Sequence, residues 1–437
     1  MAQSDVNALG LAKSAGDNQA NAVAIAAAAL RGEVDKLDAW MTRLPLRRVG
    51  ESRDMAGSLT CGRAGTAYQI NPTTGYYEQV SANVARFQRM SDGRLGLLVE
   101  PAFTQLLTAP TNPSDAAWTR TNLLADVTGR ADMLGTSTAA KVVPSTVGGN
   151  HDISQAIAGV VAGEGVTVVL ECRADGLAEG KLLVDNGAGD AWSLAYNLTT
   201  LAITSTTGTP VKTEIWSRVG GFVGIRMTQI AAASGSYTVT WRLLEGAAGD
   251  GSSGVVLSTL EGFRNIQRPA NPVRGAGTQG DDAISLTYTG NVTKPTASGG
   301  ETMLGAVEVV NSTDLMSFTT TSGVLFSTPG ASYRALWIGF NNESMPSFLY
   351  GGSLTNDRVL STTVLAPGYV LSLGYRRNGS TVEIFIDGAA DGSGSTTTVG
   401  GAATSIKVGG NWGLMISDFR FYARALSDAA LRLIAGG

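Results

Sequence analysis

The hydrophobic pattern of the first 44 residues has a helical period. Apolar and small residues recur at alternating spacings of three and four from Val6 to Leu44, which is the a/d spacing of a coiled coil. Lys13 and Gly16 weaken its start, and Pro45 ends the pattern. We therefore predict a coiled-coil anchor helix over residues 1–45. Its oligomerisation seam consists of Val23, Ala27, Leu30, Val34, Leu37, Met41 and Leu44.

This seam does not by itself set the number of helices, and two, three or more fit the pattern. The alternative is a single amphipathic helix that lies on its own domain. The terminal position, the alanine content and the basic connector after residue 44 favour the oligomeric interpretation.

After Pro45 the period changes to that of strands. Short alternating or apolar runs, such as residues 165–174, 235–246 and 381–388, are separated by glycine-rich turns. We predict a mainly β protein in which the coiled-coil helix is followed by two antiparallel β-sandwich (jelly-roll) domains. Only the last dozen residues again look helical. The predicted divisions are 1–45 anchor helix, 46–110 β connector, 111–272 first sandwich and 273–437 second sandwich, with residues 268–282 as the proline- and glycine-containing link.

The connector contains an unusual stretch, GRLGLLVEPAFTQLL, at residues 93–107. Its LGLLV part is apolar at successive positions, as expected for a strand that is covered on both faces. Glu100 followed by Pro101 forces an extended conformation and removes a backbone donor where the strand ends. We interpret the stretch as a packed structural segment without chemistry of its own.

Three phrases in the connector resemble a module of tailed-phage head-spike and tail-fibre proteins. They are RAGTAY at Arg63–Tyr68, NVARF at Asn83–Phe87 and GLLVEPAFTQLL at Gly96–Leu107. The family pattern is R-A-x-T-A-Y, then N-x-x-R-F, then G-L-L-V-E-P-A-x-T-N-L-L. The sequence departs from it at Phe103 and Gln105, where the family has arginine or a small residue and asparagine.

The resemblance extends beyond the connector. Residues 113–124 and 260–286 are similar to the entry and exit of that family's carbohydrate-binding-module-like jelly roll. Residues 375–392 and 411–434 resemble the closing strands of laminin-G-like, concanavalin-type sandwiches. These likenesses imply a virion fibre or spike with adhesive sandwich domains.

Composition excludes several classes of partner. The net charge of −4 over 437 residues includes no basic stripe, so we expect no nucleic acid and no attraction to an anionic membrane. The most apolar uninterrupted stretch, residues 22–30, is too short to cross a bilayer, and we expect no membrane insertion. Cys61 and Cys172 are expected to be reduced, structural thiols. The start lacks a signal-peptide pattern, so we expect synthesis in a host cytoplasm and residence in the virion.

Catalytic signatures are weak. His151 is the single histidine, and no G-x-S-x-G elbow accompanies it, so we expect a surface or turn histidine. GAGTQG at residues 275–280 matches a dinucleotide fingerprint but follows a proline-rich link instead of a strand. We predict a non-enzymatic protein with no catalytic, cofactor-binding or metal-binding residues. A polysaccharide hydrolase stays an alternative, because carboxylates distant in sequence can converge in space.

Aromatic residues are the candidates for sugar contact, because sandwiches bind glycans by stacking exposed rings on sugar faces. The alternative for each is a place in the core, where large aromatics are common. The overall prediction is a homo-oligomeric head fibre, spike or capsid decoration, with a trimer favoured. It would contact other virion proteins through its N-terminal region and host-surface glycans through its sandwiches, and a tail fibre that binds the receptor is the alternative. The candidate glycan-binding residues are Trp192, Tyr196, Trp216, Trp337 and Trp412.

Overall fold

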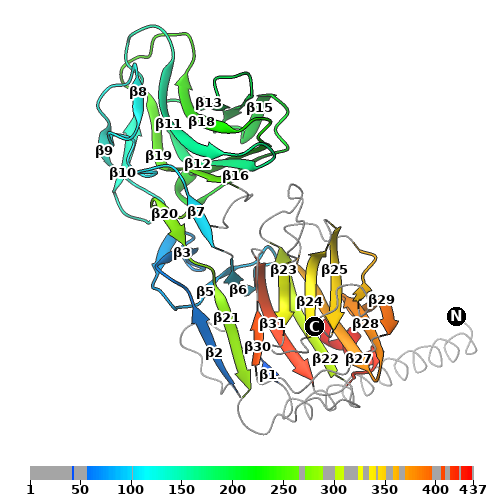
Figure 1. Ribbon diagram of the computed structural model, residues 1–437. Helices are drawn as coiled ribbons and strands as arrows, with labels where there is room; N and C mark the ends of the chain where they lie inside the picture. Colours follow the sequence, from blue (N-terminus) through cyan, green and yellow to red (C-terminus); the bar gives the residue numbers. More distant parts are fainter. Residues whose placement is uncertain are drawn as a thin grey trace, which may run out of the picture.

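The computed structural model confirms a mainly β protein built from antiparallel sheets (Figure 1). No helix of the described chain is both long enough and apolar enough to cross a membrane. The structure describes residues 42–43, 57–100, 102–264, 271–288, 301–309, 323–327, 334–340, 343–350, 358–363, 370–395, 405–408, 414–422 and 425–435.

The upper lobe in Figure 1 is a sandwich of two six-stranded sheets. Its strands are β8 (Thr119–Thr121), β9 (Val127–Arg130), β10 (Ala139–Val142), β11 (His151–Val160), β12 (Gly165–Asp175), β13 (Glu179–Asp185), β14 (Ala191–Asn197), β15 (Ala202–Thr207), β16 (Lys212–Ser217), β17 (Val223–Ile230), β18 (Gly235–Leu244) and β19 (Gly254–Arg264). The short 3-10 turn η1 (Val219–Gly221) lies between β16 and β17. We call the sheet with order β16-β17-β12-β19-β10-β9 the β12 sheet, and the sheet with order β15-β14-β13-β18-β11-β8 the β18 sheet.

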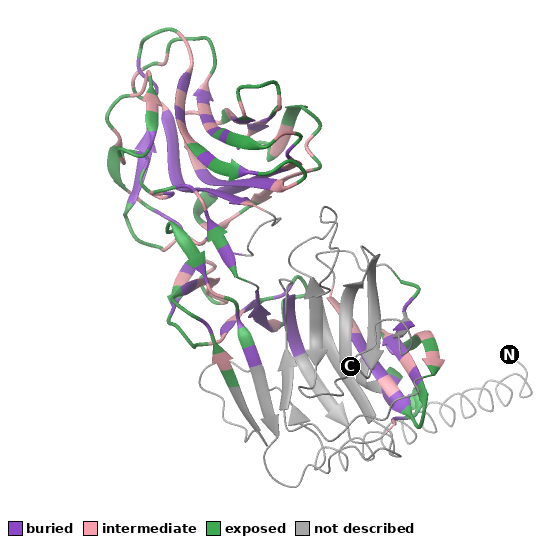
Figure 2. Cartoon of the chain, in the orientation of Figure 1, coloured by how far each residue is buried: buried purple, intermediate pink, exposed green. Residues whose placement is uncertain are grey.

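The core of this sandwich lies between the two sheets (Figure 2). Strand β18 alternates in burial, so Tyr237, Val239 and Trp241 point inward while Thr238 and Thr240 point outward. Strand β12 is different, because seven successive residues from 166 to 172 are buried. The β12 sheet is therefore covered on both faces, whereas the β18 sheet has a hydrated outer face.

The second lobe is built from two larger sheets. One has the order β29-β28-β27-β22-β31-β6-β5, with β1 also paired to β31, and the other has the order β2-β21-β30-β23-β24-β25-β26. Their strands are β1 (Thr42–Arg43), β2 (Gly57–Gly62), β5 (Arg86–Arg89), β6 (Leu95–Val99), β21 (Ala283–Tyr288), β22 (Glu301–Val309), β23 (Gly323–Ser327), β24 (Arg334–Phe340), β25 (Glu343–Tyr350), β26 (Arg358–Leu360), β27 (Val370–Asn378), β28 (Thr381–Ile386), β29 (Ala389–Ser395), β30 (Ser405–Val408) and β31 (Leu414–Tyr422).

Connector strands belong to these sheets. Strand β6 pairs with β5 on one side and with residues 414–416 of β31 on the other. Leu97, Leu98 and Val99 are 0% exposed, which confirms the prediction that the LGLLV run is covered on both faces. The C-terminal segment also forms a helix as predicted, α2 (Asp428–Ala435), and Arg376 binds its first residue at 2.6 Å.

We call the segments between the two lobes the neck (Figure 1). The neck consists of short strands and residues 271–279. A hairpin of β3 (Ala67–Ile70) and β4 (Tyr77–Val80) is one part, and β7 (Phe103–Gln105) paired with β20 (Gly277–Gln279) is the other.

Most of the predicted coiled coil lies outside the described residues, and so does every seam residue from Val23 to Leu44. Thr42 and Arg43 are described, and they form strand β1 against Phe421 and Arg420 of β31. The prediction of helix as far as residue 45 is therefore wrong at these two residues, where backbone pairing to a sheet edge replaces helical hydrogen bonds.

Candidate functional site

Residues from the three connector motifs meet in a buried ion cluster. Arg63 lies 2.7 Å from one carboxylate oxygen of Asp282, and Arg86 donates to the other. Arg86 also pairs with Glu100 at 2.8 Å, and the Glu100 backbone N–H donates to Asp282 at 3.0 Å. All four side chains are 0–1% exposed. Such buried charges require partners, so this cluster holds strands together.

The two departures from the family pattern also have structural roles. Gln105 accepts from the backbone N–H groups of Leu107 and Gly262, at 2.6 and 3.2 Å, and thereby ties the neck to β19. Phe103 packs edge-to-face on Phe263, with 6.4 Å between ring centroids. Both contacts attach the neck to the first sandwich.

Two of the predicted sugar-stacking residues lie in the core. Trp192 is 2% exposed and Tyr196 is 1% exposed. The Tyr196 hydroxyl accepts from the Trp241 indole at 2.7 Å, and Trp192 packs on Tyr237. Their interpretation as glycan platforms is wrong, because both rings point inward between the sheets and present no exposed face on which a sugar could stack.

The remaining predicted aromatics do not form a shared site in the described structure. Trp216 is half-buried on the outer face of the β12 sheet, where it packs against Phe103 and Phe263. The Arg218 guanidinium lies 5.4 Å from its ring centroid. Trp337 lies on β24, but its side chain, like the whole of Trp412, is outside the described residues.

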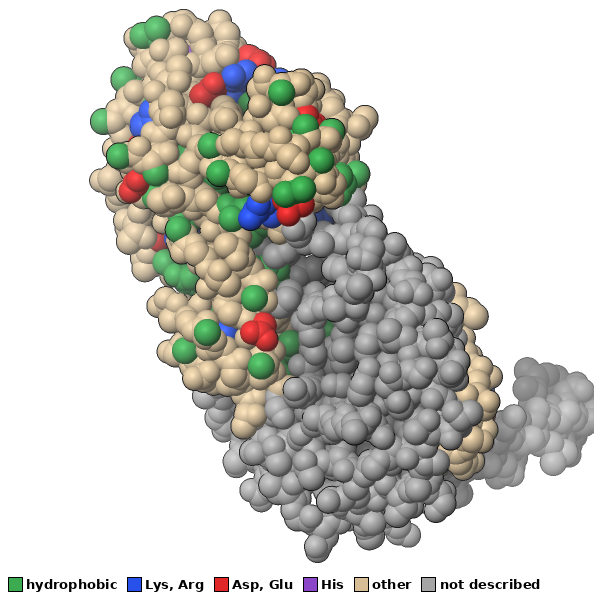
Figure 3. Space-filling model, viewed as in Figure 1, with side chains coloured by type: hydrophobic (Ala, Val, Ile, Leu, Met, Phe, Trp, Pro, Cys, Tyr) green, Lys and Arg blue, Asp and Glu red, His purple; other side chains and the backbone are tan. Residues whose placement is uncertain are grey.

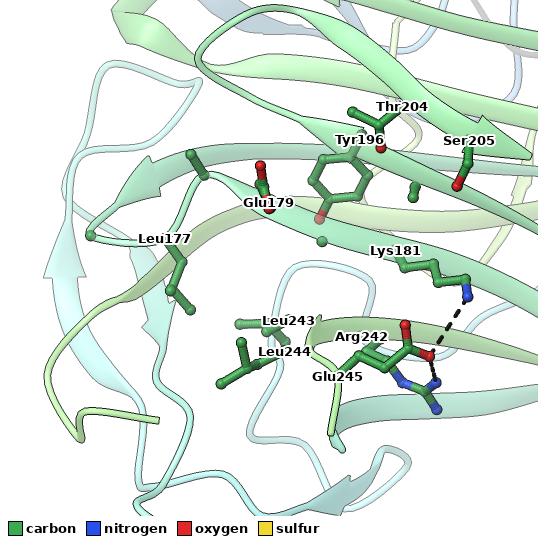
Figure 4. Close-up of a pocket in the computed structure, with 14 residues that line it drawn as sticks. Leu177, Glu179, Lys181, Tyr196, Thr204, Ser205, Arg242, Leu243, Leu244 and Glu245 are labelled. Carbon is green, nitrogen blue, oxygen red and sulfur yellow. Dashed lines mark hydrogen bonds and ion pairs between the residues drawn. The ribbon is translucent and has the colours of Figure 1, made fainter. Parts of the chain in front are cut away.

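A pocket of about 570 Å³ opens at one end of the β18 sheet (Figure 4). The side-chain nitrogen of Lys181 lies 3.6 Å from one carboxylate oxygen of Glu245. The guanidinium of Arg242 lies 2.8 Å from the same oxygen. The hydrogen bond from Arg242 is the main reason that the pKa of Glu245 is lowered. The pocket is lined by residues 176–181, Ala195, Tyr196, Thr204, Ser205 and residues 242–245.

From this pocket a row of residues crosses the outer face of the β18 sheet. In register, it runs Asp152, Arg242, Lys181, Ala195 and Ser205, one residue from each of five strands. The Arg242 guanidinium binds both Asp152 oxygens, at 2.9 and 3.0 Å. That hydrogen bonding raises the pKa of Arg242 further, so its positive charge stays fixed.

The next row along the same strands is uncharged. It runs Ser154, Thr240, Leu183, Ser193 and Thr207, and the hydroxyls of Ser193 and Thr207 lie 2.8 Å apart. We call these two rows together with the pocket the binding face. Figure 3 shows blue and red side chains next to one another on the surface of the first sandwich.

The binding face was missed in the sequence. Its residues are small and polar and match no motif. The available signal was alternation: in YTVTWRLL of β18, the threonines and Arg242 occupy the positions opposite the core aromatics. Chemically, the face offers hydroxyls and ion pairs that both donate and accept hydrogen bonds, which suits an uncharged polyhydroxylated ligand.

A second polar cluster lies on the outer face of the β12 sheet, under the neck. Glu171 accepts from the Tyr77 hydroxyl at 2.6 Å and from Arg218 at 3.2 Å. Glu261 accepts from the Arg274 backbone N–H at 2.7 Å. Burial, reinforced by the Glu171 charge, raises the pKa of Glu261 to about 7. The two glutamates are 1% and 0% exposed and are not among the pocket residues.

His151 is fully buried and is the first residue of strand β11, so the expectation of a surface or turn histidine is wrong. Its ring nitrogens face two backbone carbonyl oxygens, so no hydroxyl or thiol is placed for activation. Among the described residues, no group of three or more His, Cys, Asp and Glu could hold a metal ion.

No protein-family model and no curated protein matches this chain. Among solved structures, it is similar to the receptor binding domain of botulinum neurotoxin C/D mosaic serotype, at 14% identity and a TM-score of 0.30 over 36% of this chain and 40% of that one. The binding domain of botulinum neurotoxin DC, solved in complex with rat synaptotagmin II, matches at 12% identity and a TM-score of 0.30 over the same shares. The chain thus spans about two fifths of these structures. Similarity at this level assigns neither a family nor a function.

Proposed function

We propose that this protein is a non-enzymatic structural protein of a tailed-phage virion, a head fibre, spike or decoration that adheres weakly to host-surface glycans. The binding face carries this proposal. It combines a pocket, an in-register row of paired charges and a second row in which Ser154, Thr240 and Thr207 offer hydroxyls at half-buried or exposed positions. Sugar hydroxyls donate and accept in the same way, so they match such a surface.

The composition of the face favours an uncharged glycan. Arg242 is held by Asp152 and Glu245, and Lys181 approaches the same Glu245. Because the positive charges already have acidic partners, an anionic sugar gains little from them. The aromatic residue that lines the pocket, Tyr196, is buried, so binding through each copy is expected to be weak.

Oligomerisation compensates for weak binding. Linking several copies makes later contacts intramolecular and raises avidity by roughly 10²–10⁴. The seam predicted over residues 1–45 would supply this linkage, with a trimer favoured, and would attach the protein to other virion components.

The virion assignment rests on the connector. The residues by which the chain resembles head-spike modules include Arg63, Arg86 and Glu100, which are three of the four members of the buried cluster. A tail fibre that binds the receptor is the alternative with the same face. A polysaccharide hydrolase is less well supported. Two glutamates, Glu179 and Glu245, line the pocket, but a glycosidase acid needs a raised pKa and the pKa of Glu245 is lowered.

Two measurements on the full-length chain test the proposal. On a glycan array we expect retention on uncharged glycans at high surface density, with little binding at low density. Light scattering should give an oligomer for the full chain and a monomer for a chain that begins at Arg47. A full chain that is an oligomer yet binds no glycan would rule out adhesion, and a monomeric full chain would rule out the seam.

A further inference from the structure

His151 contacts two acceptors and no donor. Its Nδ1 lies 2.7 Å from the Asn122 carbonyl oxygen, and its Nε2 lies 2.9 Å from the Ala247 carbonyl oxygen. A neutral imidazole carries one N–H, so one of its nitrogens would present a lone pair to a carbonyl oxygen. The form that satisfies both carbonyls is the imidazolium, which donates from both nitrogens.

The two carbonyls belong to different loops. Asn122 follows β8, and its oxygen also accepts from the Ser145 N–H at 2.8 Å. Ala247 lies in the loop between β18 and β19, where the Gly246 N–H donates to the Asn150 side chain at 3.2 Å. The Gly249 N–H of the same loop donates to the Ser145 oxygen at 2.9 Å. The ring therefore bridges two loops that meet at the end of the sandwich.

This bridge adjoins the pocket. Ala247 follows Glu245 by two residues, and Glu245 is the group that Lys181 and Arg242 approach across the pocket. Holding the Ala247 carbonyl therefore restrains the segment that places the Glu245 carboxylate. A shift of this loop moves an acceptor at the rim of the binding face.

We propose that His151 is a protonation-dependent clip for the rim of the binding face. With both nitrogens protonated, the ring holds residues 245–249 against the loop at Asn122. Loss of one proton leaves a lone pair facing a carbonyl, and one of the two loops moves away. This inference assigns regulation to the site that the proposed function uses, so ligand binding is expected to be tighter at acid pH.

The charged groups on the elements around the ring have partners of their own. The paired groups are Asp152 with Arg242 on β11 and β18, Arg120 with Asp126 beside β8, Glu245 with Lys181 and Arg242, and Asp250 with Ser252 and Ser253.

The direct test uses the fact that the full chain has a single histidine. Long-range ¹H–¹⁵N correlation of the imidazole, from pH 5 to pH 8.5, reports the protonation of each ring nitrogen. We expect two N–H nitrogens at acid pH and loss of one as the pH rises. A ring that stays neutral throughout, or stays doubly protonated throughout, would overturn the proposal.

Hydrogen exchange then tests the link to the loop. After correction for chemical exchange, the Gly246 and Gly249 amides should exchange about tenfold faster at pH 8 than at pH 5.5. His151→Gln, which does not titrate, should abolish this dependence. Since Glu261 also titrates near neutral pH, Glu261→Gln is the matched control and should leave it unchanged.

A pH response that survives in His151→Gln, or disappears in Glu261→Gln, would contradict the clip. If His151→Gln fails to fold, the imidazole spectrum of the native chain decides alone. Both measurements need no ligand. Failure of glycan binding therefore leaves the clip standing, and failure of the clip leaves glycan binding standing.

Discussion

The two outer faces of the first sandwich differ in what covers them. On the β12 sheet, Glu171, Thr259 and Glu261 point outward, yet they are 1%, 0% and 0% exposed because the neck packs over them. On the β18 sheet, Lys181 and Arg242 point outward and stay accessible, with 25% and 15% of their side chains exposed. Both faces carry charged residues, and the pocket lined by Lys181, Arg242 and Glu245 opens on the second.

The two faces differ in cover more than in residue type, and the uncovered face is the one that we propose binds a ligand. A covered charge must be satisfied by protein groups, and Tyr77, Arg218 and the Arg274 backbone do this under the neck. On the other face, water supplies the remaining hydrogen bonds, and a ligand replaces that water.

The largest effect is expected where the neck joins the lobes. Asp282→Ala leaves Arg63 without its carboxylate and Arg86 with Glu100 as its remaining carboxylate. Removing one partner from a buried ion cluster costs about 3–5 kcal/mol, which denaturant unfolding measures. The control is Asp92→Ala, whose pairing with Arg94 is exposed and contributes about 0–1 kcal/mol. Equal losses in the two variants would contradict the role given to the cluster.

Glu261 should make stability depend on pH. Its folded pKa of about 7 exceeds the ordinary value of 4.5, so between these values the unfolded chain binds fewer protons than the folded one. Stability therefore falls as pH rises from about 4.5 to 7, by about 3 kcal/mol. Glu261→Gln can still accept from the Arg274 N–H and should remove this slope. Urea unfolding across that range measures it, and an unchanged slope in the variant would refute the assignment.

A smaller effect is expected under Trp216. Any Cβ on Gly224 would overlap the indole ring, which lies across this glycine on the covered face. Gly224→Ala should displace the ring and cost about 1–3 kcal/mol, with a shift in tryptophan fluorescence. Gly165→Ala on β12 is the control, because its Cβ would meet the nearest atom, Ile230 Cδ1, at an ordinary 3.9 Å.

The local pattern of apolar and polar residues predicted much of the fold. The pairing of strands that are far apart in sequence was not predicted. The apolar run of β12, the alternation of β18 and the covered LGLLV strand follow from side-chain period alone. That β6 pairs with residues 414–416 could not be predicted, because such pairing depends on side-chain fit between segments far apart in sequence.

The site was predicted less well, for a reason visible in β14. In AWSLAYN, Trp192, Leu194 and Tyr196 occupy alternate positions and so share one face, the core. The choice of large aromatics as ligand platforms overlooked this alternation. The residues of the binding face are serine, threonine and paired charges, and their arrangement depends on strand register, which single residues do not reveal.

The most direct test of the account compares two lysines on opposite sheets. Lys181 on the binding face and Lys212 on β16 have similar exposure, 25% and 28%, and each lies near a glutamate, at 3.6 and 3.8 Å. Each is replaced by methionine in the full-length chain, and retention is measured on a dense surface of the best-bound glycan. We predict about a tenfold loss for Lys181→Met and no change for Lys212→Met. Equal retention by the two variants would contradict the binding face.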